Sequence, residues 1–326
     1  MDKSVFNADA LRHVNFVGRP KTTLPCISQR SKPISSVHRH AAAHRYERPG
    51  QFISWIFQHA GLAIDGYRCE PLQRRLSACL RALHAGTEAQ ARQLLVQQPD
   101  LLPKAISALL IGVTEFFRDP SVFETVRTKI LPQLASPTRP LRVWSAGCSN
   151  GAELYSLAIL LEQIGLLECS FLLGSDCRHD AIERAQTALY NSSELRNMEP
   201  SDRRRYFNDA GSFWQPIELL RRHVSWKVAD LAQGIEEGPW DIILWRNMAI
   251  YLETGAAESV WQGLASSMTP EGVLIVGRAE RPPAALPLIN VQRCIYRLCS
   301  REDGRTFMPG PRLTSNSYTK ALETSI

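Results

Sequence analysis

Apolar residues between positions 52 and 110 recur three or four positions apart, a spacing that places side chains on one face of an α-helix. One stripe covers 52–57, a second covers 72–83, and a third helix follows Pro103. Arg74 and Arg81 fall opposite the second stripe, where they form either a solvated surface or a docking face for an acidic protein. The pattern predicts helices over residues 49–110, and we expect a small all-helical domain over residues 49–135.

The pattern changes from Leu141 onward, where short apolar runs alternate with amphipathic stretches. Alternation of this kind predicts an α/β fold with a parallel sheet covered on both faces, and ligands bind such sheets at the carboxyl ends of their strands. We expect this domain to cover residues 138–300. The predicted strands are 141–146, 170–175, 241–245 and 272–276, and the predicted helices are 152–164, 179–189 and 254–268.

The net charge of +6 is concentrated at the N-terminus. Residues 1–48 hold nine Lys or Arg and three Asp or Glu, whereas the rest of the chain holds 29 of each. This segment lacks periodicity and predicts a basic, disordered tail, with a membrane or nucleic-acid tether as the alternative. A nucleic-acid enzyme would carry its positive charge on the folded body, so we expect no nucleic-acid substrate. We expect a second disordered tail over residues 301–326.

The composition excludes several other classes of protein. No apolar run approaches the roughly 20 residues that span a bilayer, and the N-terminus lacks the apolar region of a secretory signal. The eight cysteines follow neither a C-x-x-C pattern nor a Cys/His zinc spacing, so we expect no metal site and no disulfide framework. Free thiols are typical of a reducing, cytoplasmic setting.

A glycine turn joins the first predicted strand to the next helix. Gly147 and Gly151 bracket this turn, where glycine permits a tight bend and a close backbone approach to a ligand. The turn is neither the G-x-G-x-x-G fingerprint of dinucleotide-binding proteins nor a phosphate-binding loop ending in G-K-[ST]. It therefore indicates a ligand site of another kind.

Polar residues follow the next strands. Asp176 ends the second strand, where an acid either accepts both hydroxyls of a ribose or caps a helix. Asp230 closes a later short run and could meet an adenine amino group, and a further strand delivers Arg246, Asn247 and Tyr251 to the same edge. A ribose site without a pyrophosphate fingerprint indicates an adenosine ligand lacking phosphates. S-adenosylmethionine fits that description.

Four segments together resemble the CheR-type protein-glutamate O-methyltransferases of chemotaxis. They are V-T-E-F-F-R-D (113–119), V-W-S-A-G-C-S-N-G-A-E-L-Y-S-L-A (143–158), G-S-D (174–176) and W-R-N-M-A-I-Y-L (245–252). The resemblance runs from about residue 48 to residue 300. It implies a Rossmann-like S-adenosylmethionine methyltransferase domain behind an all-helical N-terminal domain.

The resemblance also implies the site residues. Arg118 and Tyr251 are expected to border the methyl-transfer position as catalytic residues. The expected cofactor-binding residues are Gly112, Thr114, Arg118, Gly147, Glu153, Asp176, Asp230, Leu231, Arg246 and Asn247. The sequence departs from the family pattern where Gly112 and Asp230 each replace Asn, and where Asn150, Ala152 and Leu154 replace Thr, Glu and Pro in the turn.

The reaction that the resemblance implies is methylation of glutamate side chains on a chemotaxis-receptor-like signalling protein, by a monomeric enzyme. A carboxylate with a pKa of about 4.3 is already ionised near neutral pH, so this chemistry needs no general base. Arg118 could hold the acceptor carboxylate, or it could form an ion pair with Asp119. The alternatives are methylation of another protein or small-molecule acceptor, and a catalytically silent S-adenosylmethionine-binding regulator.

Receptor tethering depends on a segment before the adenine-contacting turn. Family members that dock a receptor tail carry a small three-stranded insertion there. Residues 208–224 alternate poorly and predict a modest hairpin at most. The sequence therefore predicts weak tethering to a receptor tail.

Overall fold

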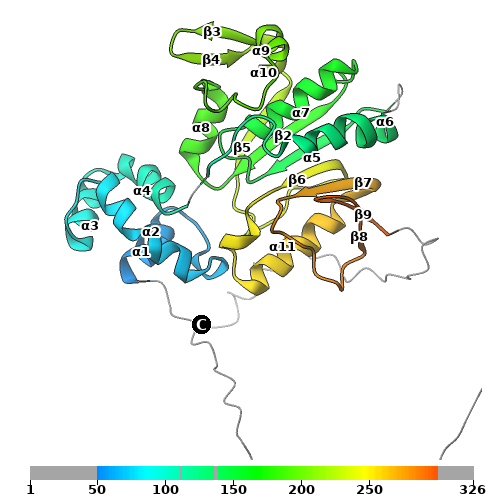
Figure 1. Cartoon of the computed structure of the whole chain (residues 1–326). Helices are drawn as coiled ribbons and strands as arrows, with labels where there is room; N and C mark the ends of the chain where they lie inside the picture. Colours follow the sequence, from blue (N-terminus) through cyan, green and yellow to red (C-terminus); the bar gives the residue numbers. More distant parts are fainter. Residues whose placement is uncertain (1–49, 111, 136–138, 300–326) are drawn as a thin grey trace, which may run out of the picture. The chain divides into compact units, whose positions relative to one another are not determined.

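The computed structural model describes residues 50–110, 112–135 and 139–299. Both predicted tails, residues 1–48 and 301–326, lie outside the described residues. In the described part, the predicted combination of a helical N-terminal region and an α/β domain is confirmed (Figure 1).

A seven-stranded sheet forms the centre of the α/β domain, in the order β5-β2-β1-β6-β7-β9-β8. The first five strands in this order run parallel, and β9 and β8 each pair antiparallel with their neighbours. Four of the strands match those predicted, whereas β5, β8 and β9 were not predicted. The strands are β1 (Arg142–Ala146), β2 (Phe171–Asp176), β5 (Val224–Val228), β6 (Trp240–Trp245), β7 (Met268–Val276), β8 (Leu288–Gln292) and β9 (Ile295–Leu298).

Helices cover both faces of this sheet (Figure 1). Helix α7 (Ala152–Gln163) packs on β1 and β2, α8 (His179–Thr187) packs beside β2 and β5, and α11 (Thr254–Ser266) covers the other face along β7. Ten of the twelve residues of α7 are buried, since neighbouring elements surround it on nearly every side. This explains why its sequence reads as apolar rather than amphipathic.

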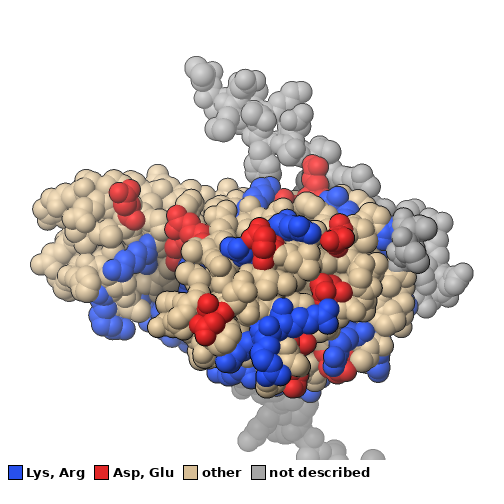
Figure 2. All heavy atoms as spheres, turned by 90° about the horizontal axis from the view of Figure 1, so that it is seen from above, with Lys and Arg blue, Asp and Glu red and all other residues tan. Residues whose placement is uncertain are grey.

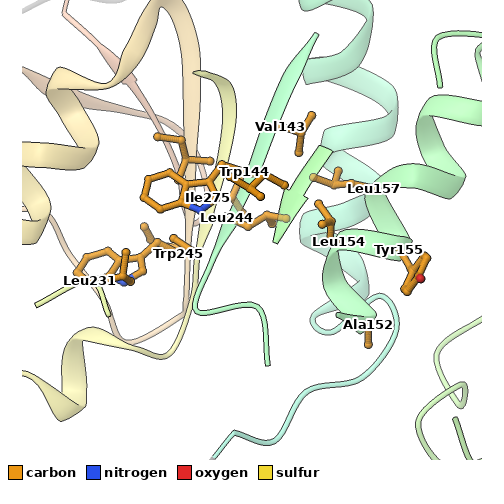
Figure 3. Close-up of a cluster of buried hydrophobic side chains, with 14 of the residues drawn as sticks. Val143, Trp144, Ala152, Leu154, Tyr155, Leu157, Leu231, Leu244, Trp245 and Ile275 are labelled. Atoms are coloured by element: carbon orange, nitrogen blue, oxygen red, sulfur yellow. The ribbon is translucent and has the colours of Figure 1, made fainter. Parts of the chain in front are cut away.

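Side chains of the central strands and α7 form the core. Figure 3 shows Leu154 and Leu157 of α7 beside Val143 of β1, and all three are fully buried. On the other side of the sheet, Trp245 of β6 lies beside Leu231. Burial of large apolar side chains contributes about 1.5–3 kcal/mol each, so this packing holds the strand ends in a fixed arrangement.

The helical region consists of α1 (Gln51–His59), η1 (Ile64–Gly66), α2 (Cys69–Ala82), α3 (Glu88–Gln97), η2 (Pro99–Leu101) and α4 (Leu102–Leu109). Backbone hydrogen bonds join it to the loop after β6. The amide of Arg68 donates to the Tyr251 carbonyl at 2.8 Å, and the amide of Glu253 donates to the Gly66 carbonyl at 2.9 Å. These bonds tie the helical region to the segment that carries Tyr251.

The segment between residues 112 and 135 contacts the α/β domain. The continuous helical run α5 (Pro120–Thr125), η3 (Val126–Ile130) and α6 (Leu131–Leu134) lies beside the sheet (Figure 1). The Phe117 amide donates to the Ser156 hydroxyl of α7 at 2.9 Å, and Phe117 stacks edge-on against Phe123. From these contacts we propose that the α/β domain begins near residue 112, ahead of the predicted boundary at residue 135.

A hairpin stands between α9 (Pro200–Tyr206) and α10 (Glu218–Arg221). Strands β3 (Phe207–Ala210) and β4 (Phe213–Pro216) pair antiparallel, and Trp214 of β4 also exchanges two backbone hydrogen bonds with Tyr190. The hairpin has the modest size that was predicted, with a single bridge in place of a third strand.

On the face shown in Figure 2, Lys and Arg side chains are interspersed with Asp and Glu side chains. Within the described ranges, no disulfide is formed and no cluster of three His, Cys, Asp or Glu side chains is arranged to hold a metal. None of the described helices is long and apolar enough to cross a membrane.

Candidate functional site

A pocket opens at the carboxyl ends of β1, β2 and β6, facing the helical region. It brings together nine of the eleven predicted site residues from five separate segments of the chain. They are Gly112, Thr114, Arg118, Gly147, Glu153, Asp176, Arg246, Asn247 and Tyr251. Asp230 and Leu231 do not line it.

The two glycines of the turn have different roles. Gly147 adopts φ +73°, and a Cβ there would lie 2.8 Å from the Met248 side chain, so glycine lets the turn and the β6 loop close together. Gly151 adopts φ +85°, but a Cβ there would meet Trp226 at 2.4 Å. Gly147 therefore shapes the pocket, whereas Gly151 makes room for a packed tryptophan.

The Asp176 carboxylate is 3% exposed and fully engaged with the protein. Its Oδ2 accepts from the Ser149 amide at 2.9 Å, and its Oδ1 accepts from the Arg178 amide at 3.0 Å. The Arg178 guanidinium adds two further bonds, from Nε to Oδ1 at 3.0 Å and from Nη2 to Oδ2 at 3.1 Å. Burial disfavours the charged guanidinium, but the attraction of Asp176 outweighs it and raises the pKa of Arg178 above its ordinary value.

Asp230 holds the helical region in place. Its carboxylate accepts from the Tyr67 hydroxyl at 2.9 Å and from the Ala63 amide at 3.2 Å. It also caps its own loop by accepting from the Ala232 amide at 2.9 Å. Burial, reinforced by Cys177 and Asp230, raises the pKa of Tyr67 far above its ordinary value, so the hydroxyl remains a donor. Leu231 packs in the core (Figure 3), and the adenine contacts expected of Asp230 and Leu231 stay predictions.

A buried ion network runs along one wall of the pocket. Glu153 accepts from the Thr114 hydroxyl at 2.8 Å and from Arg246 Nη1 at 2.7 Å. Arg246 also pairs with Asp119, and Asp119 pairs with Arg278. Burial by itself lowers the pKa of the Arg246 guanidinium, but the carboxylates of Glu153 and Asp119 raise it above its ordinary value. These ion pairs therefore keep Arg246 positively charged and its carboxylate partners negatively charged at the pocket wall.

Arg118 has a different environment. Its Nη1 donates to the Val113 carbonyl at 2.8 Å, and its guanidinium makes no ion pair within the described ranges. Asp119, the alternative partner for Arg118, is committed to Arg246 and Arg278. The Arg118 carbonyl accepts from Arg246 Nη1 at 3.0 Å, which fixes the backbone that carries this guanidinium. The Arg118 guanidinium can therefore donate hydrogen bonds to the carboxylate of a bound ligand or substrate.

Glu280 organises the loop that follows β6, although the sequence offered no signal for this role. Its carboxylate is 3% exposed and accepts four backbone amides, those of Asn247 at 2.8 Å, Met248 at 2.7 Å, Ala249 at 2.9 Å and Gly277 at 2.7 Å. Such bonds compensate a buried negative charge. Glu280 thereby stabilises the loop that leads to Tyr251.

Comparison with known proteins places this chain among methyltransferases. Residues 112–291, more than half of the chain, match the family described as CheR methyltransferase, SAM binding domain. The chain belongs to the CheR methyltransferase family. The cofactor of this α/β domain is S-adenosylmethionine, and the matched region begins where the contacts of Phe117 place the domain boundary.

Two relatives of this CheR-family chain are named chemotaxis protein methyltransferase. The protein from Listeria innocua is 29% identical over 248 residues, which cover 75% of this chain and 95% of the relative. The protein from Vibrio parahaemolyticus is 30% identical over 206 residues, which cover 60% of this chain and 75% of the relative.

The chemistry of the pocket fits S-adenosylmethionine. This molecule carries a ribose diol, an ammonium group and a carboxylate. Glu153 and, once the Arg178 fork leaves it, Asp176 supply carboxylate acceptors at the pocket. Asn247 Oδ1 is buried without a hydrogen-bond partner among the described residues. A buried acceptor without a partner costs about 1–3 kcal/mol, so a ligand donor there would be stabilising.

Several pocket residues escaped the sequence analysis. Tyr67 comes from the helical region, and its side chain reaches the pocket only because the two domains pack together. Arg178 follows Asp176 by two positions, and an arginine in that place resembles an ordinary surface residue of a helix start. Ser149 contributes a backbone amide, for which sequence carries no signal.

Proposed function

We propose that this CheR-family methyltransferase acts on glutamate side chains of a chemotaxis-receptor-like signalling protein and forms glutamyl methyl esters. The observation that carries the proposal is Arg118, a guanidinium at the pocket with no ion-pair partner in the described part of the chain. A planar guanidinium binds a carboxylate through paired hydrogen bonds.

The pocket suits a nucleophile that has no proton to lose. When bound, S-adenosylmethionine supplies a methyl group on a sulfonium, which leaves as a neutral thioether when a carboxylate oxygen takes the methyl. In our proposal Arg118 holds one oxygen of the acceptor carboxylate and leaves the other oxygen free. The Tyr251 hydroxyl, for which no hydrogen bond is formed within the described residues, offers a second donor. Orientation of this kind can contribute about 7–11 kcal/mol to a rate enhancement.

Individual cofactor contacts are also part of the proposal. We assign the ribose to Asp176, the ammonium group to Glu153, and further polar contacts to Thr114 and Asn247. Arg246 acts on this site through Glu153 and through the Arg118 backbone, as a positioning residue. The relatives' names support a chemotaxis protein as the acceptor.

The proposal is tested with S-adenosylmethionine labelled on its methyl group and an acidic receptor fragment as acceptor. We expect label to enter the acceptor and to be released as methanol by mild alkali, because carboxylate esters hydrolyse in base and N-methyl groups do not. Alkali-stable label would instead support the alternative of another acceptor group.

A second candidate is a signalling regulator that binds the cofactor without transferring the methyl group. This candidate is favoured by the two bonds from the Arg178 guanidinium to the Asp176 carboxylate, because they occupy the positions that the ribose would use. A cofactor held without its ribose contact would be poorly aligned for methyl transfer. Calorimetric binding of S-adenosylmethionine without label transfer to any acidic acceptor would support this candidate and contradict the first.

A further inference from the structure

Arg178 lies in the cofactor pocket, on the acid assigned to the ribose. Its side chain is 9% exposed, and its Nε and Nη2 bind the two oxygens of Asp176 as a planar fork. Its Nη1 lies 3.5 Å from the Leu110 carbonyl, at the limit of a hydrogen bond. The guanidinium is therefore held mainly by Asp176.

The hydrogen-bonding capacity of Asp176 decides what else it can bind. An ionised carboxylate has about four lone-pair positions. The backbone amides of Ser149 and Arg178 take one on each oxygen, and the guanidinium fork takes the remaining pair. A ribose diol also presents two donors to two carboxylate oxygens, so it needs the pair that Arg178 occupies.

Gly112 provides the space for this arrangement. A Cβ at Gly112 would lie 2.0 Å from Arg178 Nη2 and 2.2 Å from Nη1, closer than any real contact. The backbone at Gly112 is not left-handed, so a side chain there would be tolerated by the backbone itself. Glycine is therefore needed at position 112 to make room for the Arg178 guanidinium, and not to allow an unusual backbone conformation.

We propose that Arg178 determines cofactor affinity, because its guanidinium occupies the face of Asp176 that the cofactor's ribose must use. Binding of the ribose requires the Arg178 fork to leave Asp176. The observed affinity is then the intrinsic affinity multiplied by the fraction of molecules in which Asp176 is available. The inference rests on the proposed ribose contact of Asp176.

Calorimetry with S-adenosylhomocysteine, which lacks the sulfonium charge, tests the competition. We expect Arg178→Ala to bind it about tenfold tighter than the wild type, since a charge-assisted bond to be broken on binding has been removed. Arg178→Lys should give a smaller gain, because the ammonium keeps the charge and loses the fork. Arg184→Ala is the matched control, because Arg184 is an exposed arginine on α8, the helix that follows Arg178, and this variant should bind as the wild type does.

Gly112→Ala supplies an independent route to the same state. Its methyl group would displace the guanidinium, so we expect a gain in affinity similar to that of Arg178→Ala and no added gain in the double variant. Weaker binding by Arg178→Ala and Arg178→Lys, with lowered melting temperatures, would mean that Arg178 only supports the fold, and would overturn the inference.

Asp176→Asn separates this inference from the ribose assignment. If Asp176→Asn weakens binding in the Arg178→Ala background, the ribose contact stands, and an unchanged affinity of Arg178→Ala then overturns the competition alone. If Asp176→Asn leaves binding unchanged in both backgrounds, the ribose contact and the competition both fail.

Discussion

The two ends of the pocket differ in how much hydrogen-bonding capacity the protein has already used. At the end near β2, Asp176 is saturated by two amides and the Arg178 fork, and the neighbouring Asp230 is occupied by Tyr67 and Ala63. At the other end, Arg118 makes one bond to a carbonyl and no ion pair within the described ranges. We call these the ribose end and the transfer end.

Similar strand-end acids therefore serve different purposes in this fold. Asp176 and Asp230 both follow a strand of the parallel sheet, but Asp230 faces the helical region and fastens it. Arg118 lies in a loop whose backbone is held by Arg246. Tyr251 ends the 3-10 helix η4 (Ala249–Tyr251), whose start is held by Glu280. Both side chains therefore remain available to bind an acceptor. Whether a side chain at this edge of the sheet can bind a ligand therefore depends on its hydrogen-bond partners within the protein as well as on its position in the fold.

The largest effect is expected at the transfer end. Arg118→Ala should lower the methyl-transfer rate about 100-fold while weakening cofactor binding much less, because the guanidinium acts on the acceptor carboxylate as charge is transferred. Arg118→Lys should recover only part of the rate, since an ammonium lacks the fork. Single-turnover transfer at saturating cofactor measures the first effect, and calorimetry measures the second.

Arg127→Ala is the control for Arg118, because Arg127 is an exposed arginine paired with Glu124 on α5, away from the pocket. It should transfer methyl groups at the wild-type rate. A wild-type rate in Arg118→Ala would remove the distinction between the two ends.

Tyr251→Phe should have the next largest effect, about a tenfold loss of transfer rate with the cofactor affinity nearly retained. The change removes one hydroxyl donor, and a hydrogen bond contributes about 0.5–1.5 kcal/mol. A rate measured against cofactor concentration separates the maximal rate from the apparent affinity. A loss confined to affinity would instead assign Tyr251 to the cofactor.

Asp230→Ala sharpens the contrast with Asp176. Removing its carboxylate leaves the Tyr67 hydroxyl and the Ala63 amide without their acceptor, so we expect the free energy of unfolding to fall by about 1–3 kcal/mol. Chemical denaturation measures this change, with the exposed Asp100→Ala as control. Unchanged stability together with weakened cofactor binding would contradict this structural role and support the adenine contact that the sequence predicts for Asp230.

The smallest effect is expected from removal of residues 1–48. A basic segment without apolar periodicity contributes little to a core, so the melting temperature and the cofactor affinity should stay close to those of the full chain. The deletion should abolish any binding to anionic lipid vesicles, since the excess positive charge lies there. A truncated chain that fails to fold would show that the segment packs against the body.

The fold was largely predictable because its buried strands and amphipathic helices carry strong periodic signals. Strand β5 was not predicted, since Ser225, Trp226 and Lys227 do not form an apolar run, and the edge strands β8 and β9 are equally mixed. The pocket was predictable at the strand ends. The Asp176–Arg178 pairing and the clasp of Glu280 on four amides were not, because they depend on side-chain geometry and backbone donors brought together by folding.

The most direct test of the proposed function locates the transferred methyl group on the acceptor. An acidic receptor fragment is incubated with S-adenosylmethionine and either the wild type or Arg118→Ala, and its peptides are sequenced by mass spectrometry. We expect a methyl ester on glutamate side chains with the wild type and a strong reduction with Arg118→Ala. A methyl group on a nitrogen or sulfur atom, or equal glutamate methylation by both enzymes, would contradict the assignment of the transfer end.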